Sequence, residues 1–135
     1  MVCLAMGILV AASAGAESPY RLPWADGLSF MLTQAPGGRI TTHFTKATWY
    51  AVDIAMPEGM PVVAARTGVV EAVEARYGAS LEEEPLTYEG NFVRIRHADG
   101  SAATYAHLRH QGVAVAVGET VAAGRLLVYS GATGD

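Results

Sequence analysis

Five side chains of this sequence stand out as candidates for binding a metal ion or transferring a proton: the aspartate Asp53 and four histidines. Asp53 stands among apolar residues that alternate at the period of a β-strand, just before a break rich in proline and glycine at residues 57–61. A carboxylate at the end of a buried strand is costly unless it has a partner, and a metal ion is one such partner. The histidines are His43, His97, His107 and His110.

Imidazole and carboxylate groups are the ligands that zinc prefers when cysteine is absent. The single cysteine, Cys3, excludes an internal disulfide and a multi-cysteine zinc site. Each histidine taken singly fits a surface or structural role. Together with Asp53 they predict a catalytic zinc site, which needs about three protein ligands and an open position for water. The chain has no His-Glu-x-x-His motif, so a helical zinc site is not indicated.

Short strands must position these side chains. At 135 residues the chain is long enough for one domain, and 51% hydrophobic residues with 15 glycines favour strands joined by tight turns. No helical pattern is present, so we predict an all-β fold. The expected strands are one around Asp53 and segments 28–33, 40–44, 62–65, 69–75, 92–97, 102–108 and 126–129. On segment 102–108, alternation would place Tyr105 and His107 on one face.

The charge pattern argues against one class of partner. The net charge is −4 and no basic run occurs, so we expect no nucleic-acid binding. The polar insertion Gly78–Gly90 carries three consecutive glutamates and is expected to be a solvated surface loop, although a loop of this length can also wall a groove.

The N-terminal segment has the pattern of a signal peptide. Val2–Ala12 is apolar, too short to span a bilayer comfortably, and runs into the small-x-small sequence Ala14-Gly15-Ala16. No lysine or arginine precedes it, and a buried N-terminal helix is the alternative. We predict that residues 1–16 lie outside the fold as a signal peptide, that residues 17–48 form a lead-in, and that residues 49–135 form the core. The protein would then be exported, either periplasmic or secreted.

The segments YAVDIAMPEGMPV, GVVEAV, NFVRIRHADGS, TYAHL and GETVAAGRLLVYSGATGD resemble, in that order, peptidase family M23. This family comprises LytM- or lysostaphin-like zinc metallopeptidases, and YRLPWADG resembles a branch of exported bacterial members. The resemblance implies a compact antiparallel β-sheet core with a groove over one face. It also implies a zinc metalloendopeptidase that hydrolyses peptide bonds in peptidoglycan.

The resemblance also implies site residues. Asp53 would be a zinc ligand and His107 a catalytic base or transition-state donor. Many members place the first ligand where this chain has Trp49, which cannot bind zinc, and Thr42-His43 matches the upstream ligand of another branch. A third ligand and a further catalytic histidine would come from a His-x-His pair beyond Asp135. The 135 residues alone are therefore expected to be an inactive fragment that binds zinc weakly.

Two other functions stay open at this stage. A non-catalytic module of the same fold, which binds and regulates a cell-wall amidase, would suit Trp49 and the missing His-x-His pair. A carrier domain would need an exposed lysine at a hairpin tip, usually next to methionine, and Lys46 has no such neighbour. Two facing histidines, such as His43 and His107, would serve a phosphotransferase domain, but an export signal argues against a cytoplasmic phosphate relay.

Overall fold

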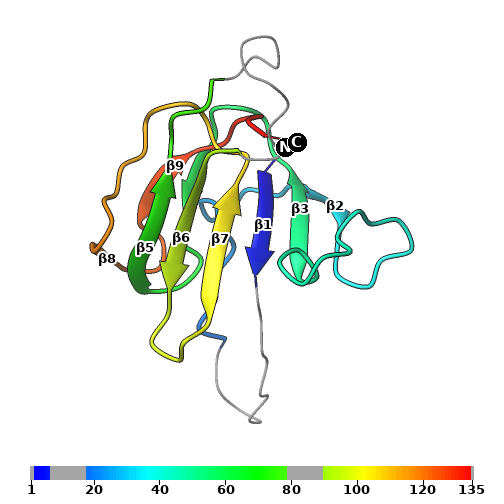
Figure 1. The fold of residues 1–135 in the computed structure, drawn as a ribbon, viewed down its shortest axis with the longest axis horizontal. Coiled ribbons are helices and arrows are strands. Elements are labelled where there is room, and N and C mark those ends of the chain that lie inside the picture. Colours follow the sequence, from blue (N-terminus) through cyan, green and yellow to red (C-terminus); the bar gives the residue numbers. More distant parts are fainter. Residues whose placement is uncertain (1, 7–17, 79–89, 135) are drawn as a thin grey trace.

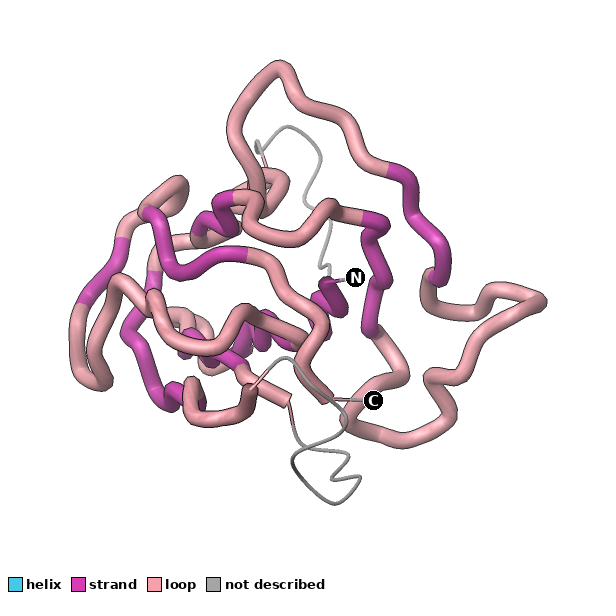
Figure 2. Tube along the Cα trace, turned by 90° about the horizontal axis from the view of Figure 1, so that it is seen from above, coloured by secondary structure: helices cyan, strands magenta, loops and turns pink. Residues whose placement is uncertain are grey.

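The computed structural model of the chain describes residues 2–6, 18–78 and 90–134, with the side chains of residues 2–6 left out of the description (Figure 1). Strands and loops make up the described residues, and no helix is present among them (Figure 2), so none could cross a membrane. The prediction of an all-β fold is confirmed. The strands are β1 (Val2–Met6), β2 (Met31–Gln34), β3 (Ala51–Ala55), β4 (Pro61–Val63), β5 (Gly68–Glu74), β6 (Phe92–Arg96), β7 (Ala102–Ala106), β8 (Thr120–Val121) and β9 (Leu126–Tyr129).

A seven-stranded antiparallel sheet dominates the structure. Its strand order is β2-β3-β1-β7-β6-β5-β8, and a separate two-stranded sheet pairs β4 with β9. Strand β9 lies behind β5 in Figure 1, whereas no other element crosses in front of β1, β7 and β6. The large sheet therefore has a core face, packed against the rest of the domain, and an open face.

Alternation along the strands separates these two faces. On β6 and β7 the residues Val93, Ile95, Ala103 and Tyr105 are all buried, and the residues between them are only partly buried. Register pairs Val93 with Tyr105 and Ile95 with Ala103, so these side chains share the core face. Burial of this face, together with Val62, Leu127 and Val128 of the small sheet, provides the hydrophobic driving force for the fold.

Tyr105 joins the two sheets by a hydrogen bond. Its side chain is fully buried, and its hydroxyl oxygen accepts a hydrogen bond of 2.7 Å from the backbone N–H of Ala65, directly after β4. An unpaired N–H at this depth would be costly, so the phenol replaces a missing backbone partner.

Ser130 also joins distant parts of the chain by hydrogen bonds. Its hydroxyl donates to the carbonyl oxygen of Pro57 at 2.6 Å and accepts from the N–H of Met60 at 2.9 Å. Its backbone accepts from Gly59 N–H and donates to the Met60 carbonyl oxygen, each at 2.8 Å. The turn after β3 is thereby held against the C-terminal tail.

The lead-in packs on the same core. Trp24 is 5% exposed, its indole N–H donates to the carbonyl oxygen of Leu28 at 3.0 Å, and Phe30 meets its ring edge-on. The backbone of Pro23 accepts a hydrogen bond from Val63 N–H at 3.0 Å. These contacts fix the segment that leads towards β2 and His43.

Three sequence predictions about strands need correction. The predicted strand 28–33 is replaced by β2, which begins at Met31. Segment 40–44 is not a strand, because nearby side chains bind its backbone N–H groups: Thr42 N–H donates to Gln34 Oε1 and His43 N–H to Thr41 Oγ1. Strand β7 ends at Ala106, so alternation does not extend to His107.

The N-terminal segment was expected to lie outside the fold, but β1 occupies a central position in the large sheet. It pairs antiparallel with β3 on one side and with β7 on the other. Residues 7–16, which include the predicted cleavage sequence, lie outside the described residues, as do residues 79–89 of the predicted surface loop. Cleavage of residues 1–16 stays a prediction.

Replacement of Tyr105 by phenylalanine tests the link between the sheets. The Tyr105→Phe change leaves the Ala65 N–H without its acceptor, so we expect the free energy of unfolding to fall by about 1–3 kcal/mol. Urea denaturation measures the change. Tyr50→Phe, at a half-exposed tyrosine, is the matched control and should change stability by less than about 0.5 kcal/mol. Equal stability of the two variants would contradict the role of the hydroxyl.

The same tyrosine predicts a pH dependence. Burial raises the pKa of Tyr105 to about 12, above the ordinary value of about 10. Because the unfolded chain ionises first, the stability that the neutral phenol provides is complete below about pH 10 and is lost as the pH rises towards 12. The difference in unfolding free energy between the wild type and Tyr105→Phe should therefore shrink between about pH 10 and pH 12. A constant difference would contradict this assignment.

Candidate metal centre and catalytic histidine

The structure brings two of the predicted site residues into contact. Asp53 lies in the middle of β3, and His43 lies on the loop between β2 and β3. Their side chains are buried, and His43 Nε2 is 3.1 Å from Asp53 Oδ1. The loop residues Thr42 and His43 are held by the side chains of Gln34 and Thr41, which present the imidazole to β3.

The face on which Asp53 lies follows from the alternation of β3. Ile54 belongs to the core cluster and Val52 packs against it, so Asp53 between them projects to the opposite, open face of the sheet. There His43 covers it, and Asp53 is only 2% exposed. A carboxylate buried on the face away from the apolar core loses its hydration, so a contribution to stability alone does not explain its position.

The pair fits two ligands of a zinc ion. Asp53 Oδ1 is buried and makes no hydrogen bond to a described residue, and its approach to the imidazole nitrogen lacks hydrogen-bond geometry. Two ligand atoms that bind one tetrahedral zinc at about 2.0–2.1 Å lie about 3.3 Å apart. The observed 3.1 Å separation is close to that value.

No third ligand joins the pair within the described part of the chain. Residues 2–6 contribute no described side chains, and the remaining described residues contain no group of three or more His, Cys, Asp or Glu side chains that could hold a metal ion. His43 and Asp53 are therefore brought together, whereas His97, His107 and His110 are not part of their cluster.

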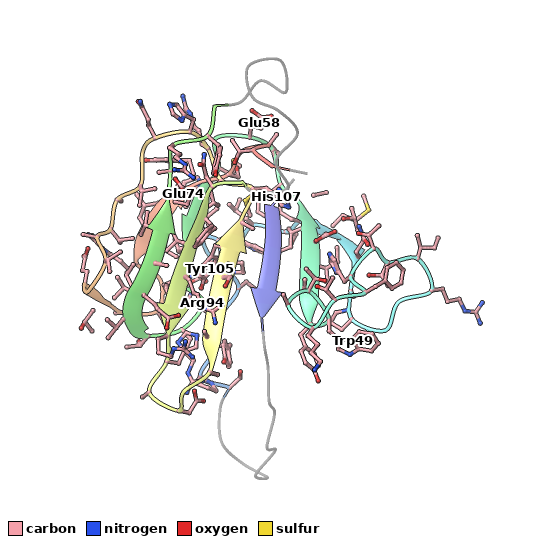
Figure 3. All side chains as sticks on the ribbon, in the orientation of Figure 1. Trp49, Glu58, Glu74, Arg94, Tyr105 and His107 are labelled. Atoms are coloured by element: carbon pink, nitrogen blue, oxygen red, sulfur yellow. The ribbon has the colours of Figure 1, made fainter. Side chains whose placement is uncertain are left out.

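Strand register places His107 near the same end of the sheet as Asp53. Asp53 lies opposite Cys3 of β1, and Cys3 lies opposite Ala106 of β7. These three backbone positions form one row, so Asp53 and Ala106 are two strand spacings apart, about 10 Å. His107 follows Ala106 directly, with φ of 55°, where the chain leaves the strand. Figure 3 shows His107 at the end of β7.

The ring of His107 is held in one tautomer. Its Nδ1 lies 2.8 Å from the carbonyl oxygen of Thr133, which can only accept a hydrogen bond. Nδ1 must therefore carry the proton in the neutral ring, and Nε2 carries the lone pair. This orientation leaves a basic nitrogen on a half-buried imidazole.

The other two histidines have structural contacts. His97 is 3% exposed, its Nδ1 bonds the carbonyl oxygen of Thr67 at 2.9 Å, and Tyr20 packs edge-on against its ring. His110 is bonded through Nδ1 to the carbonyl oxygen of Tyr77 at 2.9 Å. Both contacts hold loops in place.

Trp49 stands away from His107. Its side chain is 53% exposed, and Figure 3 shows the two residues at opposite ends of the sheet. Trp49 thus takes no part in a cluster with His107, and His43 is the imidazole that reaches Asp53.

A sequence model of peptidase family M23 matches residues 47–135, which is more than half of the chain. The chain belongs to peptidase family M23. The matched region contains Asp53 and His107, and His43 lies four residues before it. The resemblance of the sequence to this family is therefore confirmed, and so is the expectation that the fold is antiparallel and all-β.

The M23 domain also uses two buried polar residues that sequence reasoning missed, Asn91 and Thr133. Thr133 Oγ1 donates to the carbonyl oxygen of Leu108 at 2.6 Å and accepts from Asn91 N–H at 3.0 Å. Asn91 Nδ2 donates to the carbonyl oxygens of Tyr77 and Leu108. The network fixes the tail whose Thr133 carbonyl binds His107. The available signal was Asn91 itself, a polar residue at the start of an apolar strand.

Gly90 makes this packing possible. A Cβ atom at position 90 would collide with the backbone of Thr133 and Gly134. Only glycine lets the start of β6 and the tail approach so closely. The glycine beside Asn91 therefore belongs to the support of His107.

The support of His107 can be tested at Thr133. In Thr133→Val the buried Asn91 N–H loses its acceptor, so we expect a loss of about 1–3 kcal/mol in unfolding free energy. The imidazole Nδ1–H resonance of His107 should also shift in NMR spectra, because the Thr133 carbonyl moves. Thr120→Val, at an exposed position in β8, should change neither quantity. An unchanged His107 resonance in a destabilised Thr133→Val protein would argue against the positioning role.

Proposed function

We propose that this M23 domain belongs to an exported zinc metalloendopeptidase that hydrolyses peptide bonds in peptidoglycan. The observation that carries the proposal is the buried contact between His43 Nε2 and Asp53 Oδ1 on the open face of the sheet. Membership of a peptidase family and the His107 imidazole at the same end of the sheet support it. Periplasmic or secreted localisation follows from the signal-peptide pattern of residues 1–16.

A third zinc ligand has a defined place in this proposal. The backbone position of β1 that lies opposite both Asp53 and Ala106 is Cys3, and it lies between them in the sheet. Cleavage of the leader would take β1 out of the sheet and leave this place to another strand. We infer that a strand outside these 135 residues fills it and carries the His-x-His pair that the resemblance implies.

The roles of the chain's own residues follow from their surroundings. His43 and Asp53 would hold the zinc ion, which when bound supplies a Lewis acid that polarises the peptide carbonyl. His107 Nε2 accepts a proton from the attacking water, because Nδ1–H is committed to Thr133. Once protonated, the same nitrogen can donate a hydrogen bond to the developing oxyanion.

Zinc binding is the first test. In the full protein, with all its segments, we expect zinc to raise the unfolding free energy by about 3 kcal/mol at 100 times the dissociation constant. Asp53→Asn should weaken zinc binding by more than about 100-fold, measured by competition with a chelating dye. Asp26→Asn, at an exposed aspartate, is the control and should bind as the wild type does. Wild-type affinity in Asp53→Asn would refute this metal site.

Hydrolysis is the second test. With purified peptidoglycan as substrate, His107→Ala in the full protein should lower kcat by about 100- to 10,000-fold while the zinc content stays the same. His110→Ala removes an imidazole with the same kind of Nδ1 contact and should retain wild-type activity. Equal activity of wild type and His107→Ala would exclude a catalytic role for this residue.

A non-catalytic role is the second candidate, favoured by the exposed Trp49 at the position of the usual first ligand. In this role the domain would bind and regulate a cell-wall amidase. It predicts that the full protein hydrolyses no peptide bond yet raises the rate of a purified amidase. The hydrolysis assay above therefore separates the two functions.

A further inference from the structure

Three charged side chains form a chain of ion pairs on the sheet, away from the His43–Asp53 pair. Glu71 of β5 binds two residues of β6: Arg94 Nε lies 2.6 Å from Glu71 Oε2, and Arg96 Nη2 lies 2.5 Å from Glu71 Oε1. Arg96 and Arg94 together hold the pKa of the Glu71 carboxyl below its ordinary value, so the carboxylate stays ionised. Two guanidinium groups share one carboxylate, which leaves one positive charge in excess.

Strand register places Arg94 on the same face as Asp53. Arg94 lies opposite Thr104 of β7, and Thr104 stands two residues before Ala106, which shares the row of Asp53. Residues two apart on a strand project to the same side. The core-face residues Val93 and Tyr105 neighbour them in the sequence and point the other way. Arg94, Thr104 and Asp53 are therefore all on the open face.

The guanidinium of Arg94 is held in one orientation, and some of its N–H donors remain available to a ligand. Nε is bound to Glu71, and Nη1 donates to Thr104 Oγ1 at 3.0 Å. Nη2 makes no hydrogen bond to a described residue, and the side chain is 42% exposed. A guanidinium fixed at two nitrogens and open at the third is prepared to bind a carboxylate, since less rotamer freedom is lost when the ligand arrives.

The distance from the metal-binding pair matches a short peptide. From Asp53 to Arg94 the sheet spans three strand spacings, about 14 Å, and two residues along a strand, about 7 Å, which gives a separation of about 16 Å. An extended peptide covers this distance in about five residues. A substrate whose scissile bond lies at Asp53 can thus present a group about four or five residues away to Arg94.

We propose that Arg94 is a specificity residue that binds a carboxylate of the peptide substrate about four or five residues from the scissile bond. This rests on the proposed function, since it assumes a peptide that runs across the open face from the His43–Asp53 pair. Glu71 and Thr104 act as positioning residues, because they fix the guanidinium without touching the substrate. Arg96 shares Glu71 and so maintains the surplus positive charge beside Arg94.

The test uses two synthetic cross-linked stem peptides and the full protein. The peptides are identical except that the carboxylate about four or five residues from the scissile bond is an amide in one of them. The wild type should cleave the carboxylate peptide with a kcat/KM about 10- to 100-fold higher, through KM. Arg94→Gln should remove this preference and leave cleavage of the amide peptide unchanged. Arg94→Lys, which keeps the charge but loses the planar fork, should restore only part of it.

Arg125→Gln is the matched control, because Arg125 is also a half-exposed arginine paired with a glutamate, Glu119, elsewhere on the domain. It should keep the full preference. A purely structural role for the ion pairs predicts that Arg94→Gln slows both peptides equally, and this result would overturn the proposal. Equal cleavage of both peptides by the wild type would also overturn it.

Failure of the proposed function gives a different result. If the wild type cleaves neither peptide, the hydrolytic function fails, and calorimetric titration with the same two peptides then decides the role of Arg94. Tighter binding of the carboxylate peptide, lost in Arg94→Gln, supports the carboxylate site. Equal affinity for the two peptides overturns it.

Discussion

The separation of the central sheet into two faces is the constraint on which the rest of the structure depends. Because side chains alternate along β3, the residues on either side of Asp53 are committed to the core, and Asp53 itself must point away from it. The same alternation on β7 sends Tyr105 into the core and Thr104 to the other side. A shift of one residue in either strand would bury the polar side chains and expose the apolar ones. The same strand register therefore determines which residues form the core and which residues lie on the open face with Asp53.

The loop from β2 to β3 turns an exposed sheet position into a buried one. Asp53 would face solvent if His43 did not cover it, and the resulting pair is nearly inaccessible to water. Burial removes the hydration of both groups, so an approach of 3.1 Å that lacks hydrogen-bond geometry at Asp53 Oδ1 stabilises the domain poorly. A cation between their donor atoms would reverse this balance, which makes the pair easier to explain as a binding site than as part of the fold.

Much of this arrangement could be predicted from the sequence. Alternation identified the strands that carry Asp53 and Tyr105, since both segments were predicted as strands and are strands in the structure. Segment 40–44 was assigned as a strand in error, since its apolar residues resemble strand residues although Ile40 is 87% exposed. The contact of His43 with Asp53 depends on side-chain hydrogen bonds within that loop. The periodicity of apolar residues in the sequence does not indicate such hydrogen bonds. The hydrogen bond between Thr133 and His107 joins residues 26 positions apart, and local sequence patterns do not predict it either.

The hydrogen bonds that Ser130 makes have a consequence for the order in which the domain folds. Ser130 binds Pro57, 73 residues earlier, and the small sheet pairs β4 with β9, the last strand among the described residues. Contacts between such distant segments form late, because the entropy of closing a long loop must be overcome first. On a ribosome, the β4–β9 pair can form only after residue 129 has emerged. Folding of this domain therefore cannot be completed before these late residues are available, and the orientation of His107, which depends on Thr133, is completed among its last steps.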